Sequence, residues 1–286
     1  MDAGASRPSP SPQHLSVEAG PSSLESVRER LAQSGAVLVR GVLERERVGA
    51  LARAADALYA RIAGVLEREG AAGVQRGLPS GCRFAPTASS VTASALDDEA
   101  GIDVVWALVE RGPLAELLAG VHGGPCSVDL DQAWLRRQFA PDRYPPGHAP
   151  HSWHQDGALG YDFAASPAPR EGLLPLVTSW MPLVSAGRDA PGLEVIVTPI
   201  ERVLAPAELI ESSVNETYGE ALRWRPSMNP GDVMLMAPGT LHRTHVTRDM
   251  TETRTSVELR VFRAETRPER LRGDRFSPPF GSFDRD

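Results

Sequence analysis

The sequence contains no lysine, so every one of its 30 basic residues is an arginine. This absence excludes a Schiff-base lysine for pyridoxal phosphate, the lysine of a phosphate-binding loop and a serine–lysine dyad. Coding bias is the simplest explanation of the missing lysine, and the exclusions hold whatever its cause. Only two cysteines occur, Cys82 and Cys126, and they form no CxxC pair. The sequence therefore offers neither a disulfide framework nor a thiolate zinc site.

Long apolar runs are also missing. No segment reaches the ~18 apolar residues of a membrane helix, and the opening MDAGASRPSPSPQH lacks the apolar stretch of a signal peptide. The net charge is −7, and no basic stretch is interleaved with aromatic residues, which argues against nucleic acid as a partner. We therefore expect a cytoplasmic protein with neither a membrane nor a nucleic-acid partner.

Amino-acid composition and the spacing of apolar residues divide the chain into three parts. Residues 1–22 are rich in Ser, Pro and Gly and are predicted to be disordered, and the polar residues 267–286 are predicted to form a surface tail. Residues 23–266 are long enough for a single domain with one large core. Helical spacing of apolar residues or helix-start signals predict helices at 23–31, 44–69, 102–110 and 114–121. A strand is predicted at 36–40.

After Gly124 the sequence changes to short apolar or alternating segments bounded by Gly and Pro. Strands are predicted at 127–139, 174–183, 193–197, 233–236, 240–247 and 255–262. Such strands, with few helices between them, indicate a sandwich or barrel at residues 125–266. The helical residues 23–124 would buttress one face of it. The predicted fold class is mainly β with flanking helices.

One short motif carries most of the chemistry. In the segment His151-Ser152-Trp153-His154-Gln155-Asp156-Gly157, alternate residues of an extended chain point to one side, so His154 and Asp156 can bind one ion. A third ligand has to come from a distant segment, and Leu241-His242-Arg243-Thr244-His245 supplies it. Two imidazoles and one carboxylate form the facial triad of iron(II) oxygenases, which leaves three positions open for a bidentate co-substrate and dioxygen.

Two histidines compete for the third position. His242 and His245 differ by an odd number of positions, so a regular strand places them on opposite faces and only one can join the site. The Leu-His-Arg-Thr context favours His242. His148 and His151 precede the motif in a Pro-rich loop, and we expect them to be surface residues, with substrate-contacting or supporting roles left open.

An arginine follows the distal histidine at the start of an alternating segment, Arg254–Phe262. A guanidinium can grip the distal carboxylate of a dicarboxylic co-substrate through two parallel hydrogen bonds. Taken alone, Arg254 could equally be an exposed strand residue. The order HxD, distal His and then Arg on the next strand favours a functional role.

These segments resemble the phytanoyl-CoA dioxygenase-like family of iron(II)/2-oxoglutarate oxygenases. The resemblance rests on Trp153–Gly157 (WHQDG), Pro230–Ala237 (PGDVMLMA), Leu241–Thr244 (LHRT) and Arg254, and it covers roughly residues 125–263. It implies a double-stranded β-helix, or jelly roll, with Fe(II) near one mouth of the barrel. It also implies that 2-oxoglutarate and dioxygen are co-substrates.

The resemblance also assigns roles to residues. It implies that His154, Asp156 and His242 are the iron ligands, and that Arg254 binds the C5 carboxylate of 2-oxoglutarate with help from the hydroxyl of Thr244. Two further residues have weaker counterparts in the family: Gln138 resembles a polar residue that helps to hold the co-substrate, and Trp180 matches an aromatic on a core strand that is either core or pocket lining.

The residue at position 156 decides between two kinds of oxidation. Related halogenases carry Gly or Ala there, so a carboxylate at Asp156 indicates hydroxylation, with desaturation, cyclisation and epoxidation using the same ligands. A jelly-roll protein that binds metal or ligand without turnover, or a zinc hydrolase with the same triad, remains an alternative. A structural metal site would need no clamp for a dicarboxylate and would normally have a fourth protein ligand.

The substrate is expected to be a small molecule that binds to loops at about 70–86, 141–151 and 158–171. Arginines in these loops could contact an anion such as a carboxylate or a coenzyme A thioester, or could be solvated; they are Arg76, Arg83, Arg143 and Arg170. An intermediate of specialised metabolism, an amino acid and a fatty acyl derivative all fit. The oligomeric state is left open.

Overall fold

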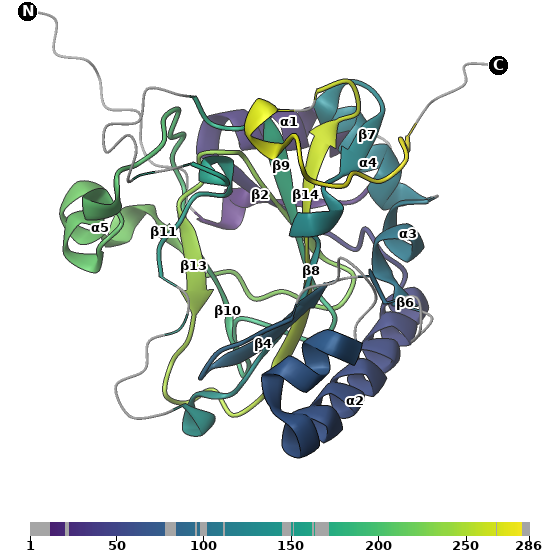
Figure 1. Ribbon diagram of the computed structural model, residues 1–286. Helices are drawn as coiled ribbons and strands as arrows, with labels where there is room; N and C mark the ends of the chain where they lie inside the picture. The colour runs from purple at the N-terminus through teal and green to yellow at the C-terminus, as the bar shows by residue number, and fades with distance from the viewer. Residues whose placement is uncertain are drawn as a thin grey trace, which may run out of the picture.

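The computed structural model describes residues 12–20, 23–77, 84–94, 96–97, 102–110, 112–144, 150, 152–161, 163, 172–266 and 268–281. Two β-sheets make up its centre (Figure 1). The large sheet has the order β1-β2-β12-β9-β14-β8-β4-β3, and β7 also pairs with β14. The small sheet has the order β11-β10-β13. A mainly β fold with flanking helices is thereby confirmed.

The strands of the large sheet are β1 (Ser16–Glu18), β2 (Ala36–Arg40), β3 (Phe84–Pro86), β4 (Ser90–Ser94), β7 (Cys126–Val128), β8 (Trp134–Gln138), β9 (Leu176–Pro182), β12 (Val233–Met236) and β14 (Arg254–Arg263). Those of the small sheet are β10 (Gly192–Ile196), β11 (Arg223–Trp224) and β13 (His242–His245). A separate pair is formed by β5 (Leu96–Asp97) and β6 (Ile102–Asp103). Apart from the parallel β1–β2 pair, neighbouring strands are antiparallel.

Each strand of the large sheet has two different faces, because successive side chains alternate. On β2 and β12, Val39 and Leu235 belong to the core cluster under the helices, whereas Leu38 and Met234 belong to the cluster between the two sheets. Strand β14 alternates in the same way, with Val257, Leu259 and Val261 in the cluster under the helices. Its other face carries Arg254, Ser256, Glu258, Arg260 and Phe262. Charged residues therefore lie inside the fold on a central strand.

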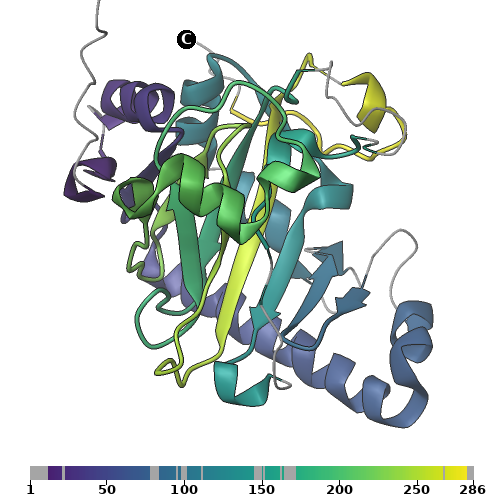
Figure 2. The same cartoon turned by 90° about the vertical axis from the view of Figure 1, so that its left-hand side faces the viewer.

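Helices cover one face of the large sheet and one lies outside the small sheet (Figures 1 and 2). The helices are α1 (Ser23–Ser34), α2 (Arg45–Gly77), α3 (Val104–Val109), α4 (Pro113–His122) and α5 (Glu211–Tyr218). Val27, Leu58, Leu108 and Leu118 of the first four pack into the same cluster as the outer residues of the large sheet. Helix α5 lies on the outside of the small sheet in both views. The helical residues thus buttress the barrel as predicted.

Some predicted elements differ from the observed ones. The strand predicted at 127–139 is two strands, β7 and β8, because Asp129 caps the 3₁₀ turn Leu130–Gln132 and its carboxylate accepts the N–H groups of Asp131 and Gln132. The helix predicted at 44–69 continues to Gly77 after a break at Gly70, whose φ of 70° favours glycine.

The expectation of disorder in residues 1–22 is wrong for the part that is described. Residues Pro12–Leu15 form a 3₁₀ turn, Ser16–Glu18 pair with β2, and Leu15 is buried between the sheets. The expected surface tail at 267–286 also contains anchored residues. Leu271 and Phe280 are buried, and the backbone of Phe280 pairs with that of Cys126.

Among the residues that the structure describes, no helix combines the length and the apolar character needed to cross a membrane.

Candidate functional site

Three residues from two distant segments meet between the sheets. His154 and His242 are partners in an isolated β-bridge, and each backbone N–H donates to the other's carbonyl at 3.1 Å. Asp156 follows at the start of a 3₁₀ turn, Asp156–Ala158. One potential ligand atom from each residue can be chosen so that all three lie within 4.8 Å of one another. The structure therefore brings the predicted triad together.

Gly157 holds the segment with the triad close to the turn before β13. Its N–H donates to the carbonyl oxygen of Pro238 at 2.8 Å. A Cβ at Gly157 would lie 2.6 Å from that same oxygen. Only glycine permits this approach without a shift of the backbone.

The two imidazoles are oriented alike. The Nδ1 atom of His154 lies 2.9 Å from the carbonyl oxygen of Ser152, and Nδ1 of His242 lies 3.0 Å from that of Thr240. Because a carbonyl oxygen can only accept, each Nδ1 carries a proton, which leaves Nε2 as the ring nitrogen that faces the site. Both Nε2 atoms lie 3.9 Å from an oxygen of Asp156.

The carboxylate of Asp156 is held at both oxygens. Arg260 Nη2 donates to Oδ1 at 2.9 Å, and the hydroxyl of Thr178 donates to Oδ2 at 2.6 Å. Burial by itself would raise the pKa of Asp156, but Arg260 and the two histidines outweigh it and hold the pKa well below its usual range. The Asp156 carboxylate is therefore ionised and oriented before any cation binds.

This donor set fits a divalent transition metal. Ligand atoms at right angles around an ion with bonds of ~2.1 Å lie ~3 Å apart, whereas one atom from each of the three residues can be chosen within 4.8 Å, so the side chains would move inward to bind an ion. Two imidazoles with one carboxylate match the facial triad. Within the described ranges, the only cluster of three or more metal-binding side chains is this one, and it contains no fourth member. An ion here would keep open positions.

A narrow chamber of about 20 Å³ adjoins the triad between the sheets. It is lined by Arg136, His154, Asp156, Thr178, Trp180, Leu193, Met236, His242, Arg243, Thr244, Arg254, Glu258 and Arg260. The predicted residues Trp180, Thr244 and Arg254 thus line the same chamber as the triad. A volume of this size holds about one water molecule, so any larger ligand requires the chamber to widen.

Arg254 is a buried cation that forms no ion pair with any residue that the structure describes. Its side chain is 1% exposed, and its Nη1 donates to the carbonyl oxygen of Gly192 at 3.2 Å. The guanidinium carbon lies 5.0 Å above the ring of Trp180, while Nε has no hydrogen-bond partner. No carboxylate among the described residues forms an ion pair with Arg254, and burial lowers its pKa to about 10. A buried unpaired charge is costly, which indicates an anionic ligand.

Four other charged residues line the chamber and were not predicted: Arg243 of the small sheet, and Arg136, Glu258 and Arg260 of the large sheet. Arg136 Nε donates to Glu258 at 2.8 Å, and Arg260 Nη1 lies 3.5 Å from the same carboxylate. Burial would raise the pKa of Glu258, but the arginines around it lower it to about 2. Together with Arg254 and Asp156, the three residues of the large sheet place three guanidiniums opposite two carboxylates, so these five residues carry a net positive charge. The alternation of β14 was the signal that could have placed Glu258 and Arg260 beside Arg254.

The remaining predicted residues lie elsewhere or outside the described residues. Gln138 is opposite Arg254 in register, but its amide donates to Ser89 O and Tyr144 Oη and does not line the chamber. His245 is on β13 but not in the triad, and burial lowers its pKa. His148 and His151 fall outside the described residues.

Comparison with known proteins identifies related structures only. No protein-family model matches the chain, and no curated protein matches it in sequence. One similar structure is the non-heme alpha ketoglutarate dependent epimerase SnoN from nogalamycin biosynthesis, with 18% identity, a TM-score of 0.52 and coverage of 86% of this chain and 84% of that chain.

Two further structures are similar over most of their length. EctD from S. alaskensis with bound Fe has 16% identity and a TM-score of 0.58, with 85% and 77% of the chains covered. AviO1 from Streptomyces viridochromogenes has 17% identity and a TM-score of 0.56, with 86% and 97% covered. What is shared is the fold. The chain has the jelly-roll core of these proteins, which confirms the predicted architecture.

Proposed function

We propose that the protein is an Fe(II)- and 2-oxoglutarate-dependent dioxygenase of the phytanoyl-CoA dioxygenase-like type. In the reaction, 2-oxoglutarate, dioxygen and a substrate C–H group give succinate, carbon dioxide and a hydroxylated product. The observation that carries the proposal is the combination of an open His154–Asp156–His242 site with the buried, unpaired guanidinium of Arg254 in one chamber. A structural metal site would need no such cation.

Different residues would bind the metal and the co-substrate. His154, Asp156 and His242 would hold Fe(II), which supplies the open coordination positions for co-substrate and dioxygen. Arg254 would bind the C5 carboxylate of 2-oxoglutarate, with the Thr244 hydroxyl beside it. This ion pair would neutralise the guanidinium and fix the orientation of the co-substrate.

Other residues prepare the site before any ligand binds. Arg260 and Thr178 keep the Asp156 carboxylate ionised and oriented. The packing of Trp180 and Met236 around the chamber limits the access of water. Because the chamber is small, binding of 2-oxoglutarate would widen it, and we expect Arg136 and Glu258 to move.

Hydroxylation is favoured over halogenation because a carboxylate occupies position 156. We infer that the substrate is a small organic molecule of specialised metabolism. This is supported by the similarity to SnoN, which comes from nogalamycin biosynthesis. Of the four arginines considered for an anionic substrate, only the side chain of Arg143 is described, and it stacks on Phe139 at 4.6 Å.

Anaerobic titration of the purified protein with Fe(II) and then 2-oxoglutarate tests the proposal. A weak visible charge-transfer band is expected, and His154→Ala, Asp156→Ala and Arg254→Ala should each diminish it. Succinate should then form on addition of dioxygen. A protein that binds Fe(II) but shows neither the band nor succinate would be a metal-binding protein of another kind, and substrate turnover without 2-oxoglutarate would indicate a hydrolase.

A further inference from the structure

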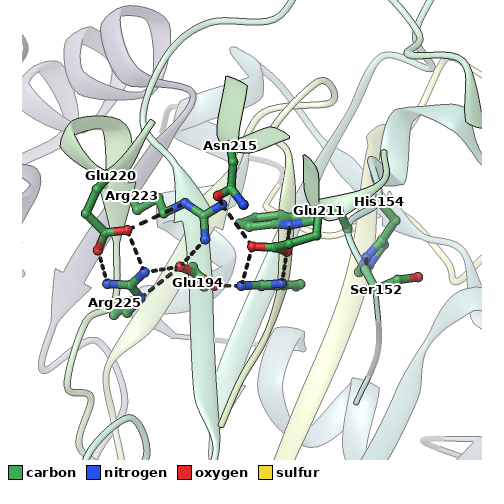
Figure 3. Close-up of polar contacts among 10 residues, drawn as sticks. Ser152, His154, Glu194, Glu211, Asn215, Glu220, Arg223 and Arg225 are labelled. Carbon is green, nitrogen blue, oxygen red and sulfur yellow. Dashed lines mark hydrogen bonds and ion pairs between the residues drawn. The ribbon is translucent and has the colours of Figure 1, made fainter. Parts of the chain in front are cut away.

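An ion-pair network covers the outer face of the small sheet (Figure 3). We call it the outer-face network; its members are Glu194, Glu211, Glu220, Arg223, Arg225 and Arg243. Three carboxylates face three guanidiniums, so the network is neutral. It joins β10, β11 and β13 to helix α5, whose first residue is Glu211.

Glu194 is the buried centre of the outer-face network. It is 1% exposed and accepts hydrogen bonds from Arg243 Nε at 2.6 Å, Arg225 Nε at 2.8 Å and Arg223 Nη1 at 3.2 Å. Burial would raise its pKa, but Arg243 and Arg225 lower it. A buried carboxylate with three charged donors fixes the position of each of them.

The network reaches the triad through two residues that adjoin its histidines in sequence. Trp153 precedes His154, and Arg243 follows His242. The indole Nε1–H of Trp153 donates to Glu211 Oε2 at 2.9 Å, and Arg243 also binds Glu211. The guanidinium carbon of Arg243 lies 4.4 Å from the centre of the Trp153 ring. Glu211 therefore links the two segments that carry the imidazoles.

Because side chains alternate along an extended chain, a contact on the outer face can fix the positions of the neighbouring residues on the inner face. Successive side chains point to opposite sides, so the side chains of Trp153 and Arg243 reach the outer-face network while the rings of His154 and His242 lie inside. Arg243 also borders the chamber. The inner rings are 4.2 Å apart between centroids. The main-chain bridge between the two histidines is isolated, with no further ladder on either side. Glu211 with its two partners thus adds a side-chain contact across this bridge, beside the hydrogen bond that the Gln155 amide donates to the carbonyl oxygen of Gly239 at 2.8 Å.

We propose that Glu211 is a positioning residue for the metal centre, acting through Trp153 and Arg243 to hold the two imidazoles at the separation that one ion requires. The inference rests on the proposed function only in assuming that the triad binds a metal. Groups that orient metal ligands typically change affinity by 10- to 100-fold when they are removed.

Titration of the metal-free protein with Co(II), followed by visible absorption and calorimetry, tests this. Glu211→Ala should weaken Co(II) binding about tenfold or more and alter the cobalt absorption bands. Glu220→Ala is the matched control, since Glu220 belongs to the same network but binds Arg225 and Arg223 rather than Trp153. It should leave both readouts unchanged.

Two variants separate positioning from general stability. Trp153→Phe keeps an aromatic ring under Arg243 but removes the indole N–H, and it should also weaken Co(II) binding. Glu211→Gln keeps an acceptor oxygen and should recover part of the affinity. Thermal unfolding of each metal-free variant shows whether its fold is intact, and if Glu211→Ala does not fold, Trp153→Phe carries the test.

Three outcomes of these measurements would overturn the inference. If the wild-type protein binds no Co(II), the metal assignment fails, and this inference fails with it. If the wild type binds but folded Glu211→Ala and Trp153→Phe bind equally well, Glu211 has no positioning role. If Glu220→Ala weakens binding as much as Glu211→Ala, the network acts only through stability, and the proposal is overturned.

Discussion

Replacing Arg254 with methionine should increase the stability of the ligand-free protein while abolishing co-substrate binding. The guanidinium is buried and forms no ion pair with a carboxylate of the described residues, and burial lowers its pKa to about 10. At 1.36 kcal/mol for each tenfold change, that lowering corresponds to a cost of about 3 kcal/mol. The hydrogen bond to Gly192 and the contact with Trp180 offset about 2 kcal/mol of it. Arg254→Met should therefore raise the free energy of unfolding by about 1 kcal/mol.

The pH dependence of this effect has a definite sign. A base whose folded pKa lies below its unfolded value is destabilising while both states are charged, and the penalty disappears only as the pH rises above about 10 toward the higher pKa of the unfolded state. The difference in unfolding free energy between wild type and Arg254→Met should therefore be constant between about pH 6 and pH 9. Urea denaturation of metal-free protein at several pH values measures it.

A neighbouring arginine gives the control. Arg136→Met makes the same chemical change in the same chamber but leaves Glu258 without its closest donor. Breaking a buried pair is costly, and we expect a loss of about 3 kcal/mol. Arg254→Met should also weaken 2-oxoglutarate binding to the Fe(II) form by about 100-fold or more, as measured by calorimetry. Destabilisation by Arg254→Met with unchanged 2-oxoglutarate affinity would refute the reasoning.

Two further predictions concern the metal ligands. His242→Ala should abolish Co(II) binding measured by calorimetry, whereas His245→Ala should leave it intact because His245 is not part of the triad; the reverse result would transfer the ligand role to His245. Arg260→Met should lower the unfolding free energy of the metal-free protein by about 3 kcal/mol, since it leaves Asp156 buried without its cation. Saturating Co(II) should reduce that loss in urea denaturation, and an equal loss with and without metal would contradict the assigned contact.

The sequence predicted most reliably those elements whose pattern is local. The strands at 36–40 and 233–236 have the predicted bounds because continuous apolar runs of that length suit strands buried on both faces. Helix α5 was not predicted, since Val214 is its only buried residue and an apolar stripe is therefore missing. Strand β4 (SVTAS) lacked a recognisable apolar pattern.

The candidate site was predictable only in part, because some of its contacts join residues that are far apart in the sequence. The sequence itself shows the spacing of His154 and Asp156 and the order of His242 and Arg254. The partners of Asp156 are not, because Thr178 and Arg260 reach it from β9 and β14 across the interior. Nothing local to either strand indicates which carboxylate it will meet, and only the register of the folded sheets decides this.

Because the two faces of β14 carry different residues, insertions and deletions within this strand should not be tolerated during evolution. A single-residue insertion inside Arg254–Arg263 would exchange its faces, carrying valines into the polar interior and guanidiniums under the helices. Both folding and chemistry would be lost at once. Length changes among homologues should therefore be confined to the connecting loops, and β14 should be the segment that aligns without gaps.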